Sequence, residues 1–157
     1  MRRSDREVTE PAEIAAIMAR AEVLRLALNG DEVPYILPVN FGMEPDGMTL
    51  YIHGAMTGTK YDLIARDNRA SFEVDCPQGL VLDEKGHMCT MNYESVIGWG
   101  YLDELTEDAD KRHGLDRIMA QYHEEGFAYG ESPIPRTRIL RLRVQERTAK
   151  RRKKVMV

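Results

Sequence analysis

The pattern of hydrophobic and polar positions begins with a helix. Residues 10–21 carry apolar side chains every three or four positions, which predicts one apolar face on an amphipathic helix. Those positions are Ile14, Ile17, Met18 and Ala21. Thr9 is the expected N-cap, because its hydroxyl can accept a hydrogen bond from a backbone N–H of the first turn. Pro11 suits that first turn, where its missing N–H costs little.

Three predicted strands follow, each separated from the next by a turn. The strands cover residues 23–28, 33–41 and 48–53, with turns at 29–31 and 44–47. Consecutive strands joined by short turns predict an antiparallel meander. The middle strand contains Pro34 and Pro38, which remove backbone donors, so we expect it at a sheet edge or at a bulge.

The rest of the chain alternates predicted strands with two more helices. A short helix is expected to end near Asn68, and a longer helix covers residues 107–124. Strands are predicted at 69–75, 89–102 and 137–144, with loops at 76–88 and 126–135. Gly98 and Gly100 are expected to bend or bulge the long strand. Because the strands lack regular crossover helices, the sequence favours a mainly β, α+β fold: an antiparallel sheet or small barrel with flanking helices.

Composition narrows the class of protein. The 157 residues are 43% hydrophobic and 31% charged, which is typical of one soluble globular domain. We expect no membrane partner, because no apolar run approaches the ~20 residues of a spanning helix and the charged N-terminus has no signal-peptide core. Two cysteines fit a reduced, cytoplasmic location better than a disulfide-rich scaffold.

The net charge of −4 conceals an uneven distribution. Six Lys and Arg and no Asp or Glu lie at or after Arg147, so residues 1–146 carry a net charge of −10. We therefore expect one domain over residues 1–146 and a basic C-terminal tail over residues 147–157. Such a run is usually a solvated terminus, and the acidic remainder would repel phosphates. Nucleic acid is not an expected partner, although binding through the tail stays open as an alternative.

The strongest candidate chemistry lies where the strand ending at His53 meets the next helix. Small residues follow that strand, and Gly58, Thr59 and Lys60 stand at the expected helix start. Backbone N–H groups of small residues can approach an anion closely, and a helix N-terminus adds partial positive charge. The helix dipole disfavours a lysine there unless an anion binds. The segment therefore fits either an anion site or an ordinary turn with an exposed lysine.

Other reactive residues form no strong pattern. Cys76, His87 and Cys89 are metal-ligand types, but they lack a C-x-x-C pair and an obvious fourth ligand, so no metal is expected. The chain has neither a Gly-x-Ser-x-Gly elbow nor a Walker-type glycine-lysine loop. These absences argue against an α/β-hydrolase triad and against a nucleoside triphosphatase.

Several longer motifs occur together in a fixed order. They are Arg2-Arg3-x-Asp5-Arg6-Glu7-Val8-Thr9, Arg25-Leu26-Ala27-Leu28, Pro34-Tyr35-Ile36-x-Pro38-Val39-Asn40-Phe41-Gly42, Leu50-Tyr51-Ile52-His53-x-Ala55-x-x-Gly58-x-Lys60 and Tyr93-Glu94-Ser95-Val96-Ile97-Gly98-x-Gly100. Across residues 1–145 the chain resembles the pyridoxamine 5′-phosphate oxidase-like flavoproteins, and within them the nitroimidazole-resistance (Nim-type) branch.

The resemblance implies an antiparallel split β-barrel that binds flavin mononucleotide (FMN), usually as a homodimer with FMN at the subunit interface. The residues that would lie along the isoalloxazine ring are Pro38, Val39, Asn40 and Phe41. Those that would hold the ribityl chain and phosphate are His53, Gly58, Thr59 and Lys60, and Ile52 is a further cofactor-binding residue. Glu94, Ser95 and Val96 would lie near the same pocket or the dimer interface. The family's phosphate site thus coincides with the anion site inferred from the residues.

Two residues of this region allow a second interpretation. His53 is the candidate catalytic residue, because a histidine can donate a proton near neutral pH, but a hydrogen bond to the cofactor is its expected main role. Trp99 could line the pocket, but we expect it in the core.

The resemblance implies a flavin-dependent reductase of small acceptors, with nitroaromatic or nitroimidazole compounds as candidate substrates. A non-catalytic flavin or haem carrier or sensor stays open, as does a pyridoxamine phosphate oxidase-like oxidase. A deazaflavin in place of FMN is a further alternative. The oxidase interpretation is weakened because Arg136-Thr137-Arg138 cannot be matched securely to the substrate-phosphate residues of the oxidases proper.

Overall fold

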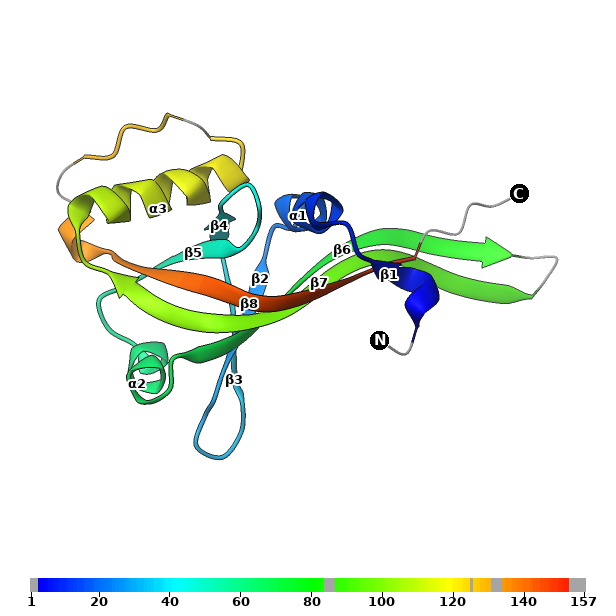
Figure 1. The fold of residues 1–157 in the computed structure, drawn as a ribbon, viewed down its shortest axis with the longest axis horizontal. Helices are drawn as coiled ribbons and strands as arrows, with labels where there is room; N and C mark the ends of the chain where they lie inside the picture. Colours follow the sequence, from blue (N-terminus) through cyan, green and yellow to red (C-terminus); the bar gives the residue numbers. More distant parts are fainter. Residues whose placement is uncertain (1–2, 84–86, 125, 131–133, 153–157) are drawn as a thin grey trace.

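A single sheet with flanking helices makes up the molecule (Figure 1). The computed structural model describes residues 3–83, 87–124, 126–130 and 134–152. The strands are β1 (Glu7–Val8), β2 (Leu24–Leu28), β3 (Tyr35–Val39), β4 (Phe41–Met43), β5 (Thr49–Gly54), β6 (Arg69–Asp83), β7 (Met88–Leu105) and β8 (Arg138–Arg152). The helices are α1 (Pro11–Ala19), α2 (Thr59–Arg66) and α3 (Asp108–Gln121), with short 3-10 helices at Ser4–Arg6 and Ile134–Arg136. Among the described residues, no helix is long and apolar enough to cross a membrane.

The strands pair antiparallel in the order β3-β2-β6-β7-β8-β5-β4, and β1 adds to β8. This confirms the predicted α+β class with an antiparallel sheet. The two ends of this order, β3 and β4, are separated in the chain by Asn40 alone. Because consecutive Cα atoms are only ~3.8 Å apart, the two ends of the sheet meet at Asn40. The sheet is therefore curled into a half-barrel whose two ends meet at this crossing.

The predicted meander of three strands is wrong. Residues 33–41 contribute to two strands instead of one: β3 pairs with β2 at one end of the sheet, whereas β4 pairs with β5 at the other. Apolar alternation determines which face a residue occupies but not which strand it pairs with, so the pattern gave no sign of the break at Asn40. The expectation of an edge strand is confirmed for β3, which pairs with β2 alone among the described strands.

β6 and β7 are longer than the sequence pattern indicated. β6 continues to Asp83 and pairs with β7 as far as Met88, so most of the predicted loop 76–88 belongs to a two-stranded arm (Figure 1). A register shift between Pro77 and Leu80 accommodates the Pro-Gln-Gly sequence that resembles a turn. A bulge of this kind inserts an extra residue without ending the strand.

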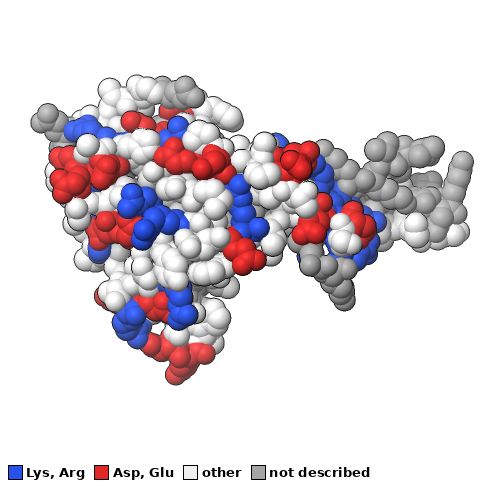
Figure 2. Space-filling view, in the orientation of Figure 1, with Lys and Arg blue, Asp and Glu red and all other residues white. Residues whose placement is uncertain are grey.

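β8 likewise continues far beyond the predicted end at residue 144. It reaches Arg152, so residues 147–152 of the predicted basic tail are strand, and residues 153–157 lie outside the described residues. Figure 2 shows Lys and Arg interleaved with Asp and Glu on the visible face. Arg151, one of the basic residues of the predicted tail, forms ion pairs with Glu13 and Glu94.

A bulge near the middle of β8 changes which of its side chains face the core. Trp99 pairs with Glu146 and Gly100 with Val144, which leaves Gln145 as an extra residue opposite the predicted bend. A one-residue insertion shifts the alternation of faces. On the inner face, which carries the larger core, the residues of β8 are Arg138, Leu140, Leu142 and Val144 before the bulge, and Arg147, Ala149 and Arg151 after it.

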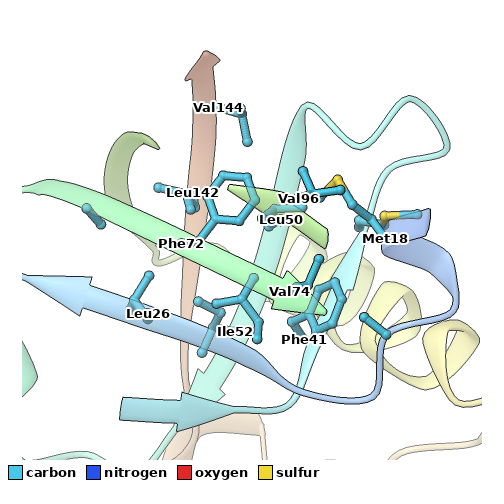
Figure 3. Packing of buried hydrophobic residues seen from close by; sticks show 14 of the residues in the cluster. Met18, Leu26, Phe41, Leu50, Ile52, Phe72, Val74, Val96, Leu142 and Val144 are labelled. Carbon is cyan, nitrogen blue, oxygen red and sulfur yellow. The ribbon is translucent and has the colours of Figure 1, made fainter. Parts of the chain in front are cut away.

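The larger core fills the space between the inner face and α1. Figure 3 shows side chains from α1 and from most of the strands meeting there, including Met18, Phe41, Phe72, Val96 and Leu142. A smaller core joins α3 to the outer face, and its buried members are Tyr51, Leu105, Ile118 and Ile139. The outer face is the face of β5 and β8 that carries Tyr51 and Ile139, together with its continuation across β7, β6, β2 and β3.

α1 and α3 confirm the two longer predicted helices, with a difference at the start of α1. Its N-cap is Glu10 instead of Thr9, and Pro11 occupies the first turn. At its other end, the side-chain amide of Gln121 on α3 donates hydrogen bonds to the carbonyls of Met18, Ala19 and Ala21 at 3.0–3.3 Å. A long-range contact, which no local pattern predicts, thus satisfies the carbonyls at the end of α1.

Glu94 is the one fully buried charged side chain among the described residues. Arg20 at the end of α1 and Arg151 of β8 each donate to its carboxylate at 2.5 Å, as does Gln78 of β6. Burial favours the neutral acid, but the two guanidinium groups outweigh it and hold the pKa of Glu94 below its ordinary value. The carboxylate thus ties α1 to the sheet at the base of the arm.

We predict that Glu94→Gln lowers the free energy of unfolding at pH 7 by about 3 kcal/mol, because it leaves two guanidinium groups without their buried partner. The Glu94 contribution is complete above the unfolded glutamate pKa of ~4.3 and is lost as the pH falls through the lower folded pKa. In urea titrations at several pH values, the free energy of unfolding of the variant should therefore fall less steeply at acidic pH than that of wild-type protein. Glu73→Gln, which disrupts an exposed pair with Arg25, should cost less than about 1 kcal/mol. Equal losses from both variants would contradict this assignment.

Candidate functional site

The predicted anion site is formed by the turn between β5 and α2 and by the first residues of α2. Gly58 is the N-cap of α2, with a φ of 149°, and Thr59 and Lys60 begin the helix. Gly58 and Thr59 are exposed, and Lys60 is half-buried. The turn therefore presents its backbone and the positive end of the helix dipole toward solvent, beside a lysine.

Tyr61 anchors this turn to the sheet. Its side chain is buried, and its hydroxyl donates a hydrogen bond to the carbonyl of Ala55 at 2.7 Å. Burial raises the pKa of Tyr61, so the phenol stays protonated. Gly54 makes this packing possible, because a Cβ atom there would lie 2.5 Å from the Tyr61 hydroxyl and 2.9 Å from Nζ of Lys60.

A second cation joins the site from β8. Arg138 pairs with Gly54 across the two strands, and its guanidinium carbon lies 3.7 Å from the centroid of the Tyr61 ring. Nζ of Lys60 lies 4.6 Å from the same centroid, so the ring carries both cations. Arg138 also pairs with Glu104, which raises the pKa of the guanidinium. Sequence reasoning did not assign Arg138, because its place depends on the β5–β8 register.

His53 lies on the other face of the same strand. It is exposed and pairs with Ile139, whereas its neighbour Gly54 pairs with Arg138. Because successive side chains of a strand point to opposite faces, His53 lies on the outer face and the Lys60–Arg138 pair on the inner face. Ile52, also assigned to the cofactor, is fully buried in the larger core.

The segment expected along the isoalloxazine ring has Asn40 at its exposed centre. The Asn40 side-chain amide and the Phe41 backbone N–H both donate to the Tyr122 hydroxyl, at 3.0 and 3.2 Å. That hydroxyl in turn donates to the carbonyl of Glu22 at 2.8 Å. The Phe41 ring is fully buried. Tyr122, which sequence reasoning missed, therefore fixes the crossing between the two ends of the sheet.

The remaining predicted site residues lie elsewhere in a single chain. Glu94 belongs to the buried ion cluster, Val96 is buried in the core, and Ser95 pairs with Lys150. Lys150 is twelve positions from Arg138 along β8, about 40 Å at 3.3 Å per residue. One chain thus does not bring these residues to the anion site.

The outer face of β2, β6 and β7 has an exposed apolar surface. One cross-strand row there runs from Ile36 through Ala27 and Ser71 to Trp99. Trp99 is 38% exposed and meets Tyr101 edge to face, with ring centroids 5.8 Å apart, so the expected core position for this tryptophan is wrong. Beside the two rings is a hollow of about 590 Å³.

Cys76, His87 and Cys89 do not assemble into a metal site. Within the described ranges, no group of three His, Cys, Asp or Glu side chains is placed to hold a metal ion. The Cys76 thiol instead donates to the carbonyl of Ile17, with sulfur and oxygen 3.6 Å apart, and burial raises its pKa.

Comparison with known proteins identifies relatives of the whole chain. The sequence model of a family described as pyridoxamine 5′-phosphate oxidase matches residues 10–151, whereas no curated protein sequence matches the chain. A proposed 5-nitroimidazole antibiotic resistance protein from Bacteroides thetaiotaomicron has a solved structure that is 26% identical, with a TM-score of 0.82. The match covers 92% of this chain and 85% of that chain.

Two further solved structures share the fold at 20% identity. The flavocytochrome Anf3 from Azotobacter vinelandii matches with a TM-score of 0.80, over 98% of this chain and 72% of that chain. The FAD- and haem-binding protein from Mycobacterium smegmatis matches with a TM-score of 0.78, over 95% and 74% of the two chains. The expected split barrel is therefore confirmed.

We predict that Tyr122→Phe lowers the free energy of unfolding by about 1–3 kcal/mol, because two donors and a carbonyl lose their shared partner. Thermal and urea unfolding would measure the loss. Tyr129→Phe is the matched control, since the buried Tyr129 hydroxyl has no hydrogen-bond partner in the described structure. The control should be neutral or slightly stabilising. A Tyr122→Phe variant as stable as the control would show that the crossing does not depend on this hydroxyl.

Proposed function

Because the chain belongs to the pyridoxamine 5′-phosphate oxidase family, we propose that it is an FMN-binding flavoprotein that reduces small acceptors. The observation that carries this proposal is the pair of cations, Lys60 and Arg138, on the ring of Tyr61 beside the exposed start of α2. This arrangement fits the dianionic phosphate of FMN, which would be held by charge-assisted hydrogen bonds and by the helix N-terminus.

The ring of the flavin would lie beside the exposed crossing at Asn40. The Phe41 N–H and the Asn40 side-chain nitrogen are already bonded to Tyr122, so we assign the backbone of Asn40 and its side-chain oxygen to the ring edge. Tyr122 would hold these groups in place before the cofactor binds. Such preorganisation raises affinity because less freedom is lost on binding.

We further propose that the protein is a homodimer with the cofactor at the subunit interface. The exposed row from Ile36 to Trp99 supports this, because an apolar surface that spans several strands is typical of an interaction site. A dimer would also account for Ser95, which one chain leaves far from the anion site. In that arrangement the second copy would bring Ser95 to the cofactor, whereas Glu94 and Val96 stay buried in their own chain.

Bound flavin supplies hydride and electron transfer, and this chain supplies binding, orientation and proton supply. Lys60 and Arg138 would neutralise the phosphate, Asn40 would orient the ring, and the partner's apolar surface would exclude water. His53, exposed on the outer face away from Lys60, is assigned to the substrate, where its imidazole could deliver a proton. The related 5-nitroimidazole resistance protein supports nitroaromatic compounds as the acceptor class.

Lys60→Ala tests the phosphate site. We expect FMN to bind about 10- to 100-fold more weakly, as measured by fluorescence titration of the apoprotein, because one charge-assisted contact is lost. Arg66→Ala removes a positive charge from the other end of α2, where Arg66 pairs with Asp31, and should leave FMN affinity unchanged. Equal affinity of Lys60→Ala and wild-type protein would refute the site. Mass identification of the released cofactor separates FMN from FAD, a deazaflavin and haem.

His53→Gln tests turnover separately from binding. We expect FMN affinity to stay within about twofold, while reoxidation of the reduced flavin by a 5-nitroimidazole slows by about 100-fold, the contribution typical of a general acid. Anaerobic stopped-flow absorbance would measure the rate. A variant with wild-type turnover would exclude His53 as the proton donor. Wild-type protein that holds FMN but transfers no electrons to any acceptor would instead favour the carrier or sensor alternative.

A further inference from the structure

Arg147 lies at a gap in the strand pairing of β8. On the side opposite β7, β8 pairs with β5 up to Arg143 and with β1 from Ala149 onward. Between these pairings the bulge at Gln145 turns Arg147 to the inner face, opposite Gly98. The arginine thus points toward α1 at a place where no described strand covers this side of β8.

In the part of the chain that the structure describes, Arg147 has no carboxylate partner, which distinguishes it from four other arginines of its strand. Arg138, Arg141, Arg143 and Arg151 each form an ion pair with a carboxylate. No carboxylate of the described residues lies within 4.0 Å of the Arg147 guanidinium, whose polar contact is the sulfur of Met18 at 3.7 Å. Burial lowers the pKa of Arg147. A partly buried cation without an ion-pair partner is costly, so an anion that paired with Arg147 would be stabilising.

The guanidinium borders a hollow of about 620 Å³. Its walls come from the first turns of α1 and from the turn before β5, and they include Pro11, Ala12, Ile14, Ala15, Pro45 and Met48. Apart from Arg147, the charged residue in the lining is Asp46, whose Oδ1 accepts a hydrogen bond from the Met48 N–H at 2.9 Å. The hollow therefore combines apolar walls with a cation that has no ion-pair partner within 4.0 Å among the described residues, and with one carboxylate, Asp46, elsewhere in the lining.

The turn before β5 makes room for this cation. Gly47 has a φ of 65°, which favours glycine, and a Cβ atom there would lie 2.5 Å from Nη1 of Arg147. The guanidinium consequently packs against bare backbone at the edge of the hollow. Arg147 is nine positions from Arg138 on β8, about 30 Å at 3.3 Å per residue, so this site is separate from the candidate flavin phosphate site.

We propose that the hollow binds an amphipathic monoanion: a small carboxylate with an apolar chain, its carboxylate paired with Arg147 and its chain against the α1 wall. Such a ligand satisfies both features of the site, since the carboxylate supplies the missing counter-ion and the chain covers the apolar surface. The proposal does not depend on flavin binding.

Octanoate is the probe, titrated at pH 7.5 into the purified full-length protein by isothermal calorimetry, with octanamide as its neutral counterpart. We expect saturable octanoate binding and at least about tenfold weaker binding of octanamide, because the amide lacks the charge that pairs with Arg147. Arg147→Met should bind octanoate at least about tenfold more weakly and should unfold at a higher temperature than wild-type protein, because a partly buried charge without an ion-pair partner is removed.

Two further variants keep the test independent of folding defects. Arg143→Met removes an exposed arginine of the same strand and should bind octanoate as wild-type protein does. Ala12→Leu, on the exposed side of α1 where it lines the hollow, should block binding while Arg147 remains. The proposal is overturned if octanoate does not saturate, if octanamide binds equally well, or if Arg147→Met and Ala12→Leu bind octanoate like wild-type protein.

Discussion

The register of β8 in the middle of the sheet controls most of the chemistry of this protein. β8 pairs with β7 along almost its whole length, and with β5 and then β1 on its other side. One extra residue, Gln145, shifts the alternation between these two halves. Consequently three arginines of one strand, Arg138, Arg147 and Arg151, all face inward but meet three different environments.

Those environments have different roles. Arg151 joins Arg20 at the buried carboxylate of Glu94 and stabilises the junction between α1 and the arm. Arg138 stands beside Lys60 on the ring of Tyr61, where two cations and a helix N-terminus suit a phosphate group. Arg147 has no anion of its own. The same strand thus supplies a structural ion pair, a candidate cofactor contact and a candidate ligand contact.

Local sequence features predicted most helices and strands, but not which strands pair with one another or which distant side chains form ion pairs. The helical spacing in residues 10–21, the proline-containing edge strand and the lysine at the start of α2 all have local causes, and each is found in the structure. The separation of β3 from β4 at Asn40 was missed because alternation gives faces and not neighbours. The basic run after Arg147 resembled a solvated tail because nothing nearby in sequence reveals the carboxylates of Glu13 and Glu94.

The candidate site likewise contains some residues that the sequence could reveal and others that it could not. Gly58, Thr59 and Lys60 could be found from residue types and spacing, because an anion site at a helix start is a local feature. Arg138 and Tyr122 reach the site only through the β5–β8 register and through the packing of α3, so no motif contains them. His53 follows Ile52 in the chain but lies on the outer face, because successive residues of a strand alternate.

The central claim is that the Lys60–Arg138 pair holds the phosphate of a flavin. A crystal structure of the FMN-loaded protein tests it most directly. The account predicts that the phosphate lies at the start of α2, within hydrogen-bond distance of Nζ of Lys60 and of the Arg138 guanidinium. A phosphate bound anywhere else on the protein, with Lys60 and Arg138 still stacked on Tyr61 and free of it, would contradict the account.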